Sequence, residues 1–165
     1  MNDSSEPASL EAPEAPGLHY VATLEVDVDE PVTIGKTVDG IRKVVPIRGG
    51  RVFGPAFSGR ILSAGADFQQ YPSEDLAYLS ASYILELTDG HRILVENHAI
   101  RTGSPADLAA LMDGGKVDAN NIYFRCCPRL TAEVEGPYNW INRTMFIGSG
   151  QRQPESVFIY LFRLA

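Results

Sequence analysis

The chain has 165 residues, of which 44% are hydrophobic, 21% charged and 9% aromatic. This size and composition are typical of one globular domain and exclude a multidomain assembly or a wholly disordered chain. With 14 Lys and Arg against 21 Asp and Glu, the formal net charge is -7. Its field repels phosphate backbones, so we expect no nucleic-acid partner.

The sequence also argues against a membrane protein and a metal site. No stretch approaches the roughly 20 apolar residues that cross a bilayer. The start, MNDSSEPASLEAPEAPG, has neither a basic region nor an apolar signal segment, so we expect a cytoplasmic protein. Cys126 and Cys127 are adjacent, and with 3 His they leave too few ligands for a standard zinc site. Because no nucleotide-binding fingerprint occurs either, we expect no cofactor.

Strand patterns fill most of the chain after its first segment. Residues 1–17 are rich in Pro, Glu, Ser and Ala, which predicts a disordered tail before a domain at 18–165. From His19 onward apolar and polar residues alternate, as in a half-buried strand. Similar runs separated by Gly and Pro predict further strands at about 32–38, 41–47, 51–54, 57–63, 78–88, 91–100, 121–127, 129–135, 138–147 and 156–164. So many short strands indicate an all-β barrel or sandwich.

Two local signals are more specific. Asp89-Gly90 lies between two alternating runs and predicts a hairpin with a two-residue type I′ turn. In that hairpin Tyr83 and Asn97 fall in the apolar phase, toward the core. One short helix is predicted near 105–113, because Ser104 suits the N-cap, a proline follows and a Gly-Gly pair ends the run.

Several polar residues occupy apolar phases of these strands. A buried polar group costs roughly 1–3 kcal/mol unless it is hydrogen-bonded. A cluster of them therefore indicates either an internal network or a cavity. The candidates are Arg42, Asp67, Gln69, Tyr83, Asn97, Arg101, Arg125, Tyr138, Trp140 and Asn142.

Each candidate also has a structural interpretation. Asp67, in GADFQQ, either accepts a substrate proton near a barrel rim or forms an Asx turn with its own backbone. The segment YNWIN, read as a strand, supplies either an aromatic ligand wall or ordinary core aromatics. The arginines either clamp a flat anion or remain solvated. The adjacent cysteines are best interpreted as small hydrophobic residues. His98 lies in the outward phase of its strand.

The strings PIRGGRVFGPAFSGRILSAGADFQQ, YILELTDGHRILVENHAIR and YNWIN resemble the family called domain of unknown function 3237, or uncharacterised protein family 0311. The resemblance runs from about Leu18 to the C-terminus. It implies a closed, mostly antiparallel, lipocalin-like β-barrel that associates as a homodimer, and it implies no defined activity. Nine of the candidates, all but Arg125, lie on or beside the motif positions. One departure is His98, where family members often carry glycine.

Three functions fit these residues. The first is a cofactor-independent lyase or isomerase for a small oxygenated, aromatic or partly apolar compound, with Asp67, Tyr83 and Arg101 as catalytic residues. Its substrate would be held by Arg42, Gln69, Asn97, Tyr138, Trp140 and Asn142. The second is a non-catalytic carrier or sensor of a small ligand, and the third is a structural module with a filled barrel. A titratable cluster in a cavity would favour the enzyme.

The C-terminal run SVFIYLFRL predicts a partner chain. It is apolar on both strand phases, so burying one face in the core leaves the other in water. A second copy is the simplest cover, and we therefore expect a homodimer.

Overall fold

The computed structural model describes residues 12–165 of the chain. The first part of the predicted tail, residues 1–11, lies outside the described residues. Residues 12–17 are exposed and form neither helix nor strand. From Leu18 onward the chain is mostly β-strand.

Ten antiparallel strands make one sheet in the described part of the chain. Two 3₁₀ turns, η1 (Ala119–Asn121) and η2 (Asn139–Arg143), and one α-helix, α1 (Pro105–Met112), interrupt them. The strands are β1 (Leu18–Val28), β2 (Val32–Thr37), β3 (Gly40–Phe53), β4 (Gly59–Ile61), β5 (Ala66–Ser73), β6 (Leu76–Leu87), β7 (Arg92–Thr102), β8 (Tyr123–Ala132), β9 (Phe146–Arg152) and β10 (Ser156–Leu164).

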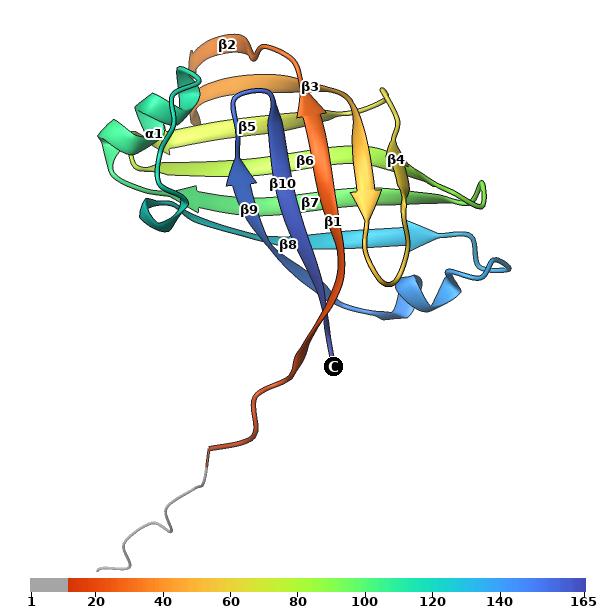
Figure 1. The fold of residues 1–165 in the computed structure, drawn as a ribbon. Helices are drawn as coiled ribbons and strands as arrows, with labels where there is room; N and C mark the ends of the chain where they lie inside the picture. The colour runs from red at the N-terminus through yellow and green to blue at the C-terminus, as the bar shows by residue number, and fades with distance from the viewer. Residues whose placement is uncertain (1–11) are drawn as a thin grey trace, which may run out of the picture.

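The sheet closes into a barrel around the long strand β3. One edge of β3 pairs with β2 and then β1, and the other pairs with β5 and then β4. The ten strands therefore occupy eight positions, since β1 shares one with β2 and β4 shares one with β5. Pairing of β1 with β10 completes the ring (Figure 1). The all-β, antiparallel barrel expected from the sequence is confirmed.

Strand alternation fills the barrel interior with apolar side chains. Leu24, Leu85, Ile93 and Leu161 are buried almost completely, as the inward face of a small barrel requires. The prediction that Tyr83 and Asn97 face the core is confirmed, because their exposed fractions are 2% and 6%.

The helix α1 agrees with its predicted signals. The Ser104 hydroxyl accepts a hydrogen bond from the Asp107 backbone N–H, and Pro105 lies in the first turn. Figure 1 shows α1 at one end of the barrel, next to the ends of β5, β6 and β7. Within residues 12–165, no helix has both the length and the apolarity needed to cross a bilayer.

The hairpin between β6 and β7 is present, but its predicted turn type is wrong. Type I′ needs positive φ at both central residues, and Gly90, with φ 88°, is the one with positive φ here. The Gly90 N–H donates to the Leu87 carbonyl, and the Leu87 N–H donates to the His91 carbonyl. This is the three-residue loop in which the glycine forms a bulge, and it preserves the predicted strand pairing.

A bulge explains why two predicted strands are one. The break expected between 41–47 and 51–54 is a bulge inside β3, between Ile47 and Gly49, where the register with β1 shifts. Gly50 has a φ of 137°, and a Cβ on this residue would lie 2.0 Å from the Glu25 carbonyl oxygen. The bulge turns the strand by one side-chain phase, so Val45 and Ile47 before it and Val52 after it all face inward.

Two other predicted elements are also corrected. Asp67, expected near a barrel rim or in an Asx turn, lies instead within strand β5, where it pairs with Val45 and Ala81. The predicted strand 138–147 is instead η2 followed by the start of β9. Its aromatic residues therefore do not alternate along a strand.

Candidate functional site

The barrel interior contains a cavity at the end covered by α1, where Leu111 and Met112 contribute to its wall. It leaves ≈ 70 Å³ for the centres of water molecules, which is room for a few waters or a small ligand. Alternate residues of the inward strand faces line it, including Asp67, Gln69 and Tyr71 of β5 and Asn97, Ala99 and Arg101 of β7.

A chain of hydrogen bonds crosses one wall of this cavity. Arg101 Nη2 donates to the Tyr71 hydroxyl over 3.0 Å, and that hydroxyl donates to Gln69 Oε1 over 2.6 Å. Gln69 Nε2 then donates to Asp67 Oδ2 over 2.7 Å. Because each donor points toward the carboxyl, the chain fixes the Gln69 amide and links Arg101 to Asp67 through two neutral groups.

Four polar atoms at the cavity are buried and have no protein partner. They are Asp67 Oδ1, Tyr83 OH, Asn97 Oδ1 and Arg101 Nε. A buried polar atom without a partner is costly, so such atoms mark a place for water or a ligand. Four around one cavity make this the candidate functional site.

Burial sets the protonation of the two acidic groups closest to the network. Desolvation raises the pKa of Asp67 above its ordinary value, and the Gln69 hydrogen bond and the Arg101 charge oppose that rise. Desolvation also raises the pKa of Tyr71, so its phenol stays protonated and able to donate. The Asp67 carboxyl is thus shifted toward the range in which it can both hold and release a proton.

The deeper groups of the cavity stay neutral. Desolvation strongly raises the pKa of Tyr83, which is therefore a phenol donor and not a phenolate. Burial also raises the pKa of the neighbouring Cys126 thiol to about 11, which keeps it from acting as a nucleophile. This agrees with its interpretation as a small hydrophobic residue.

Three cationic side chains line the same cavity. Arg101 is 4% exposed, whereas Lys43 and Arg152 are half-buried. The Lys43 ammonium lies 5.6 Å from the centroid of the Tyr71 ring, and Arg152 Nη1 donates to the Ser156 carbonyl over 3.2 Å. No carboxylate of the described residues lies within 4.0 Å of their charged nitrogens.

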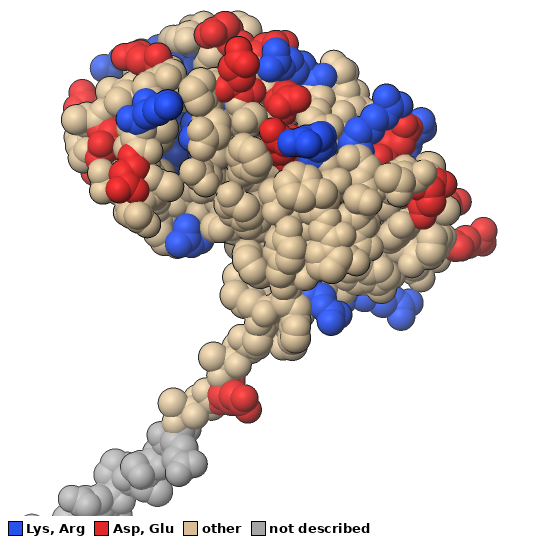
Figure 2. Space-filling model, in the orientation of Figure 1, with Lys and Arg blue, Asp and Glu red and all other residues tan. Residues whose placement is uncertain are grey.

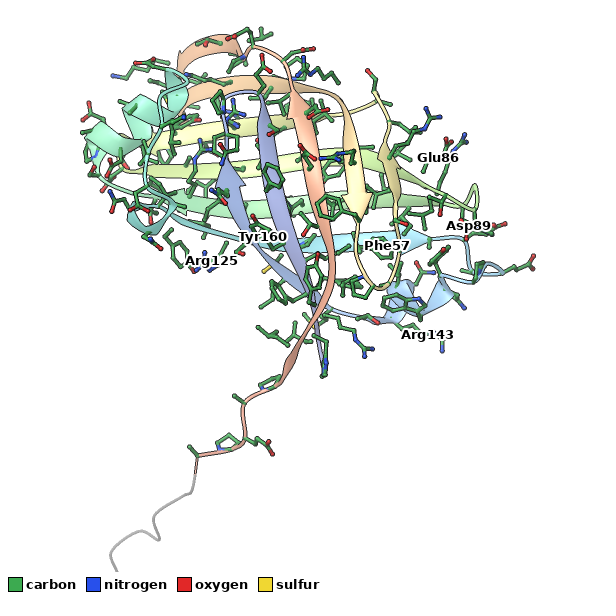
Figure 3. The ribbon with its side chains drawn as sticks, viewed as in Figure 1. Phe57, Glu86, Asp89, Arg125, Arg143 and Tyr160 are labelled. Carbon is green, nitrogen blue, oxygen red and sulfur yellow. The ribbon has the colours of Figure 1, made fainter. Side chains whose placement is uncertain are left out.

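The aromatic wall expected from YNWIN lies elsewhere. The Tyr138 hydroxyl donates to Asp89 Oδ2 over 2.8 Å, and Asn142 bonds to the backbone N–H and carbonyl of Ala132. Trp140 is 36% exposed and packs against Phe146. Figure 3 shows Asp89 and Arg143 at the barrel end opposite α1. The prediction that Trp140 joins Asp67, Tyr83, Asn97 and Arg101 at one cavity is therefore wrong for Trp140 and correct for the other four.

Arg42 and Arg125 lie on the outside of the barrel. Arg42 approaches Asp39 at 3.7 Å, and Arg125 Nη1 donates to the Phe124 carbonyl over 2.9 Å. Since Lys43 is in the phase of Val45 and Ile47, its neighbour Arg42 must face outward. The expectation that Arg42 holds a substrate in the cavity is therefore wrong, because its side chain lies on the other side of the wall.

Sequence reasoning missed three polar members of the site: Lys43, Tyr71 and Arg152. The position of Tyr71 could have been predicted, because Asp67, Gln69 and Tyr71 recur at every second residue, which is the alternation of a strand. Arg152 follows a Gly-Ser-Gly segment without a clear pattern, so its inward position depends on tertiary structure. No group of three or more His, Cys, Asp or Glu residues in 12–165 is arranged to hold a metal ion.

Comparison with known proteins places the chain in a family. The model of the family described as "Protein of unknown function (DUF3237)" matches residues 16–164. The chain belongs to this family. A UPF0311 protein of Bradyrhizobium diazoefficiens is 39% identical to it over 140 residues, which cover 85% of this chain and 91% of the relative.

Solved structures of similar proteins share the barrel. A crystal structure of a conserved protein of unknown function from Rhodopseudomonas palustris has a TM-score of 0.88 at 34% identity, covering 93% of this chain and 100% of that one. A β-barrel-like protein from Acinetobacter baumannii has a TM-score of 0.80 at 33% identity, covering 94% and 100%. An enzyme from Penicillium herquei matches at 0.69 with 16% identity over 94% and 98%, and at that identity the similarity concerns the fold alone.

Proposed function

We propose that this DUF3237 protein is a cofactor-independent enzyme that transfers a proton on a small oxygenated, partly apolar molecule, as a lyase or isomerase does. The observation that carries the proposal is Asp67, a carboxyl with an unpartnered buried oxygen facing a cavity and a raised pKa. Carboxyls of this kind serve as general acids and bases.

In the proposed reaction, Asp67 Oδ1 as carboxylate takes a proton from a carbon next to a carbonyl. The electron pair of the broken C–H bond forms an enolate. The enolate oxygen accepts hydrogen bonds from neutral or cationic donors such as Tyr83 and Arg101. The protonated Asp67 then returns the proton to another atom of the substrate, or the enolate expels a leaving group, which takes the proton from Asp67 as it departs. Since the enzyme is regenerated by proton movement alone, the cycle needs no redox cofactor.

The hydrogen-bond chain supports this assignment because it suits both states of Asp67. Gln69 donates to Oδ2, which favours the carboxylate, while burial favours the acid. Oδ1 remains available for the substrate. A simple carrier would not need a carboxyl in this position, so we favour the enzyme over the carrier and over a filled structural barrel.

The test is hydrogen–deuterium exchange at carbons next to carbonyl groups, followed by proton NMR in D₂O with a panel of small ketones and keto acids. This readout detects proton transfer whatever product the natural reaction forms. We expect Asp67→Asn to slow exchange by about 100-fold or more while ligand binding persists, because the amide keeps the shape and cannot titrate. Glu135→Gln, the same change at an exposed residue outside the site, serves as the control.

Three results would contradict the proposal in different ways. Equal exchange by Asp67→Asn and the parent protein removes Asp67 from the mechanism. Binding without exchange of any panel compound favours the carrier. No binding at all favours the structural module.

A further inference from the structure

We propose that Lys43, Arg101 and Arg152 make the cavity an anion-binding site, and that the substrate is a small organic carboxylate with an apolar body. The inference rests on the proposed function only in taking this cavity as the substrate site. It assigns the charge of the ligand, which the acid–base proposal leaves open.

The first observation is the balance of charge at the cavity. Three cationic side chains line it, whereas Asp67 is the one carboxyl among its lining residues. Even with Asp67 ionised, these four side chains together carry a net positive charge. The cavity is therefore cationic in a protein whose formal net charge is -7, and such a site concentrates anions from solution.

The second observation is that these cations lack partners. Within residues 12–165, none of the three has a carboxylate within 4.0 Å, and the buried Nε of Arg101 has no hydrogen-bond acceptor. By contrast, the exposed Arg60 and Arg92 outside the cavity both pair with Glu86. A buried guanidinium without a counter-charge is costly, so a bound anion would remove a penalty that the protein otherwise carries.

The third observation concerns where negative charge is available. The carboxyls that act on Arg152 are Asp67 and the exposed Glu30, and neither lies within ion-pair distance of it. Desolvation, and after it the positive charge of Arg101, lowers the pKa of Arg152. A carboxylate bound between the two guanidinium groups would offset the electrostatic repulsion between them.

The remaining wall defines the rest of the ligand. It is mostly apolar, with Val45, Leu79, Phe124 and Ile159 among its residues. A space of ≈ 70 Å³ for water centres limits the ligand to a small one. Together these features indicate a small carboxylate with an apolar body, and they argue against a polyanion such as a nucleotide.

The experiment measures the binding of benzoate and of its neutral analogue benzamide to the full-length protein by titration calorimetry at low salt. We expect benzoate to bind at least about 10-fold more tightly, which is the effect of one charge-assisted contact. Arg152→Gln and Lys43→Gln should each reduce benzoate affinity by about 10-fold and leave benzamide unchanged. Arg125→Gln, an exposed arginine on the outer wall, should change neither.

A second measurement does not depend on the folding of any variant. Benzoate binding to the parent protein should weaken as ionic strength rises, whereas benzamide binding should not. Equal affinity for the two probes, or failure of benzoate and of acetate and naphthoate to bind at millimolar concentration, overturns the inference.

The outcomes separate this inference from the proposed function. Anion-selective binding without proton exchange supports the anion-binding site and contradicts the proposal that the protein is an enzyme. Proton exchange on neutral ketones, with no preference for anions, supports the enzyme and contradicts the anion site.

Discussion

Asp67 shows how one side chain can be costly for folding and useful for chemistry. It lies on a strand among apolar neighbours, with one oxygen held by Gln69 and the other without a partner. Placing a carboxyl there reduces stability, because its charged form is poorly solvated. Residues of this kind are retained where function requires them.

The pH dependence of stability should reveal this cost. Since the pKa of Asp67 is raised in the folded state, the unfolded chain releases that proton at lower pH, and stability is lost as pH rises above the ordinary value of 3.8. Asp67→Asn cannot ionise, so it should unfold a few degrees higher than the parent at neutral pH. The difference should narrow as pH falls toward about 4. Thermal unfolding across this range checks it, and a difference independent of pH would contradict the raised pKa.

The Tyr71 hydroxyl should contribute to stability through two partners. Tyr71→Phe leaves both Arg101 Nη2 and Gln69 Oε1 without that partner. We expect a loss of about 1–3 kcal/mol, because buried groups then remain unsatisfied. Tyr78→Phe is a matched control, since Tyr78 is exposed on the outer wall. Urea unfolding measures both variants, and equal stabilities would show that the network contributes little.

At the level of elements, β5 decides the composition of the site. It carries three polar residues in its inward phase and lies between β3 and β6, so its position depends on close contact with β6. Just before it, Gly65 packs directly against Ser82 and Tyr83. This glycine is required for a close approach, where a turn was expected.

Gly65→Ala should therefore displace the start of β5. The new Cβ would lie 2.3 Å from the Ser82 carbonyl oxygen and 2.9 Å from Tyr83 Cβ, which are backbone and core positions that cannot easily move. We expect a loss of about 1–3 kcal/mol, as for other overpacked sites. Gly17→Ala meets Ala165 Cβ at 3.7 Å, an ordinary contact, and should be neutral. Unfolding curves of the two variants that coincide would refute the argument.

The sequence allowed a good prediction of elements that depend on local pattern. Alternation placed Tyr83 and Asn97 inward, and the capping signals at Ser104 located α1. It failed where tertiary structure overrides the pattern. The bulge between Ile47 and Gly49 inverts the phase of β3 after residue 47, and η2 carries Trp140 to the far end of the barrel.

At the scale of the whole molecule, β10 retains the feature that predicted a homodimer. Ile159 and Leu161 face the core, while Phe158, Tyr160 and Phe162 on the other phase are half-buried. Figure 2 shows few charged side chains over the lower part of β1 and β10, near the point where both ends of the chain leave the barrel. An apolar outer face of this kind is typical of an interface.

We expect the protein to sediment as a dimer at micromolar concentration. A Phe158→Glu and Tyr160→Glu double variant should sediment as a monomer and keep its β-sheet circular dichroism spectrum, because both side chains lie on the outer phase. Glu135→Gln serves as the control here as well. A parent protein that is monomeric at this concentration would remove the prediction.

The pairing of β1 with β10 also affects how the barrel folds. The register joins Leu18 to Leu164, and the Ala165 N–H donates to the Gly17 carbonyl over 3.0 Å, so the ring closes between segments from opposite ends of the domain. Until β10 pairs with it, β1 has β3 on one edge and an open edge on the other. Contacts between residues so far apart in sequence form slowly, and an unpaired edge invites association with other chains. A folding intermediate in which the ring is still open therefore exposes this edge, and we expect aggregation during refolding to begin there.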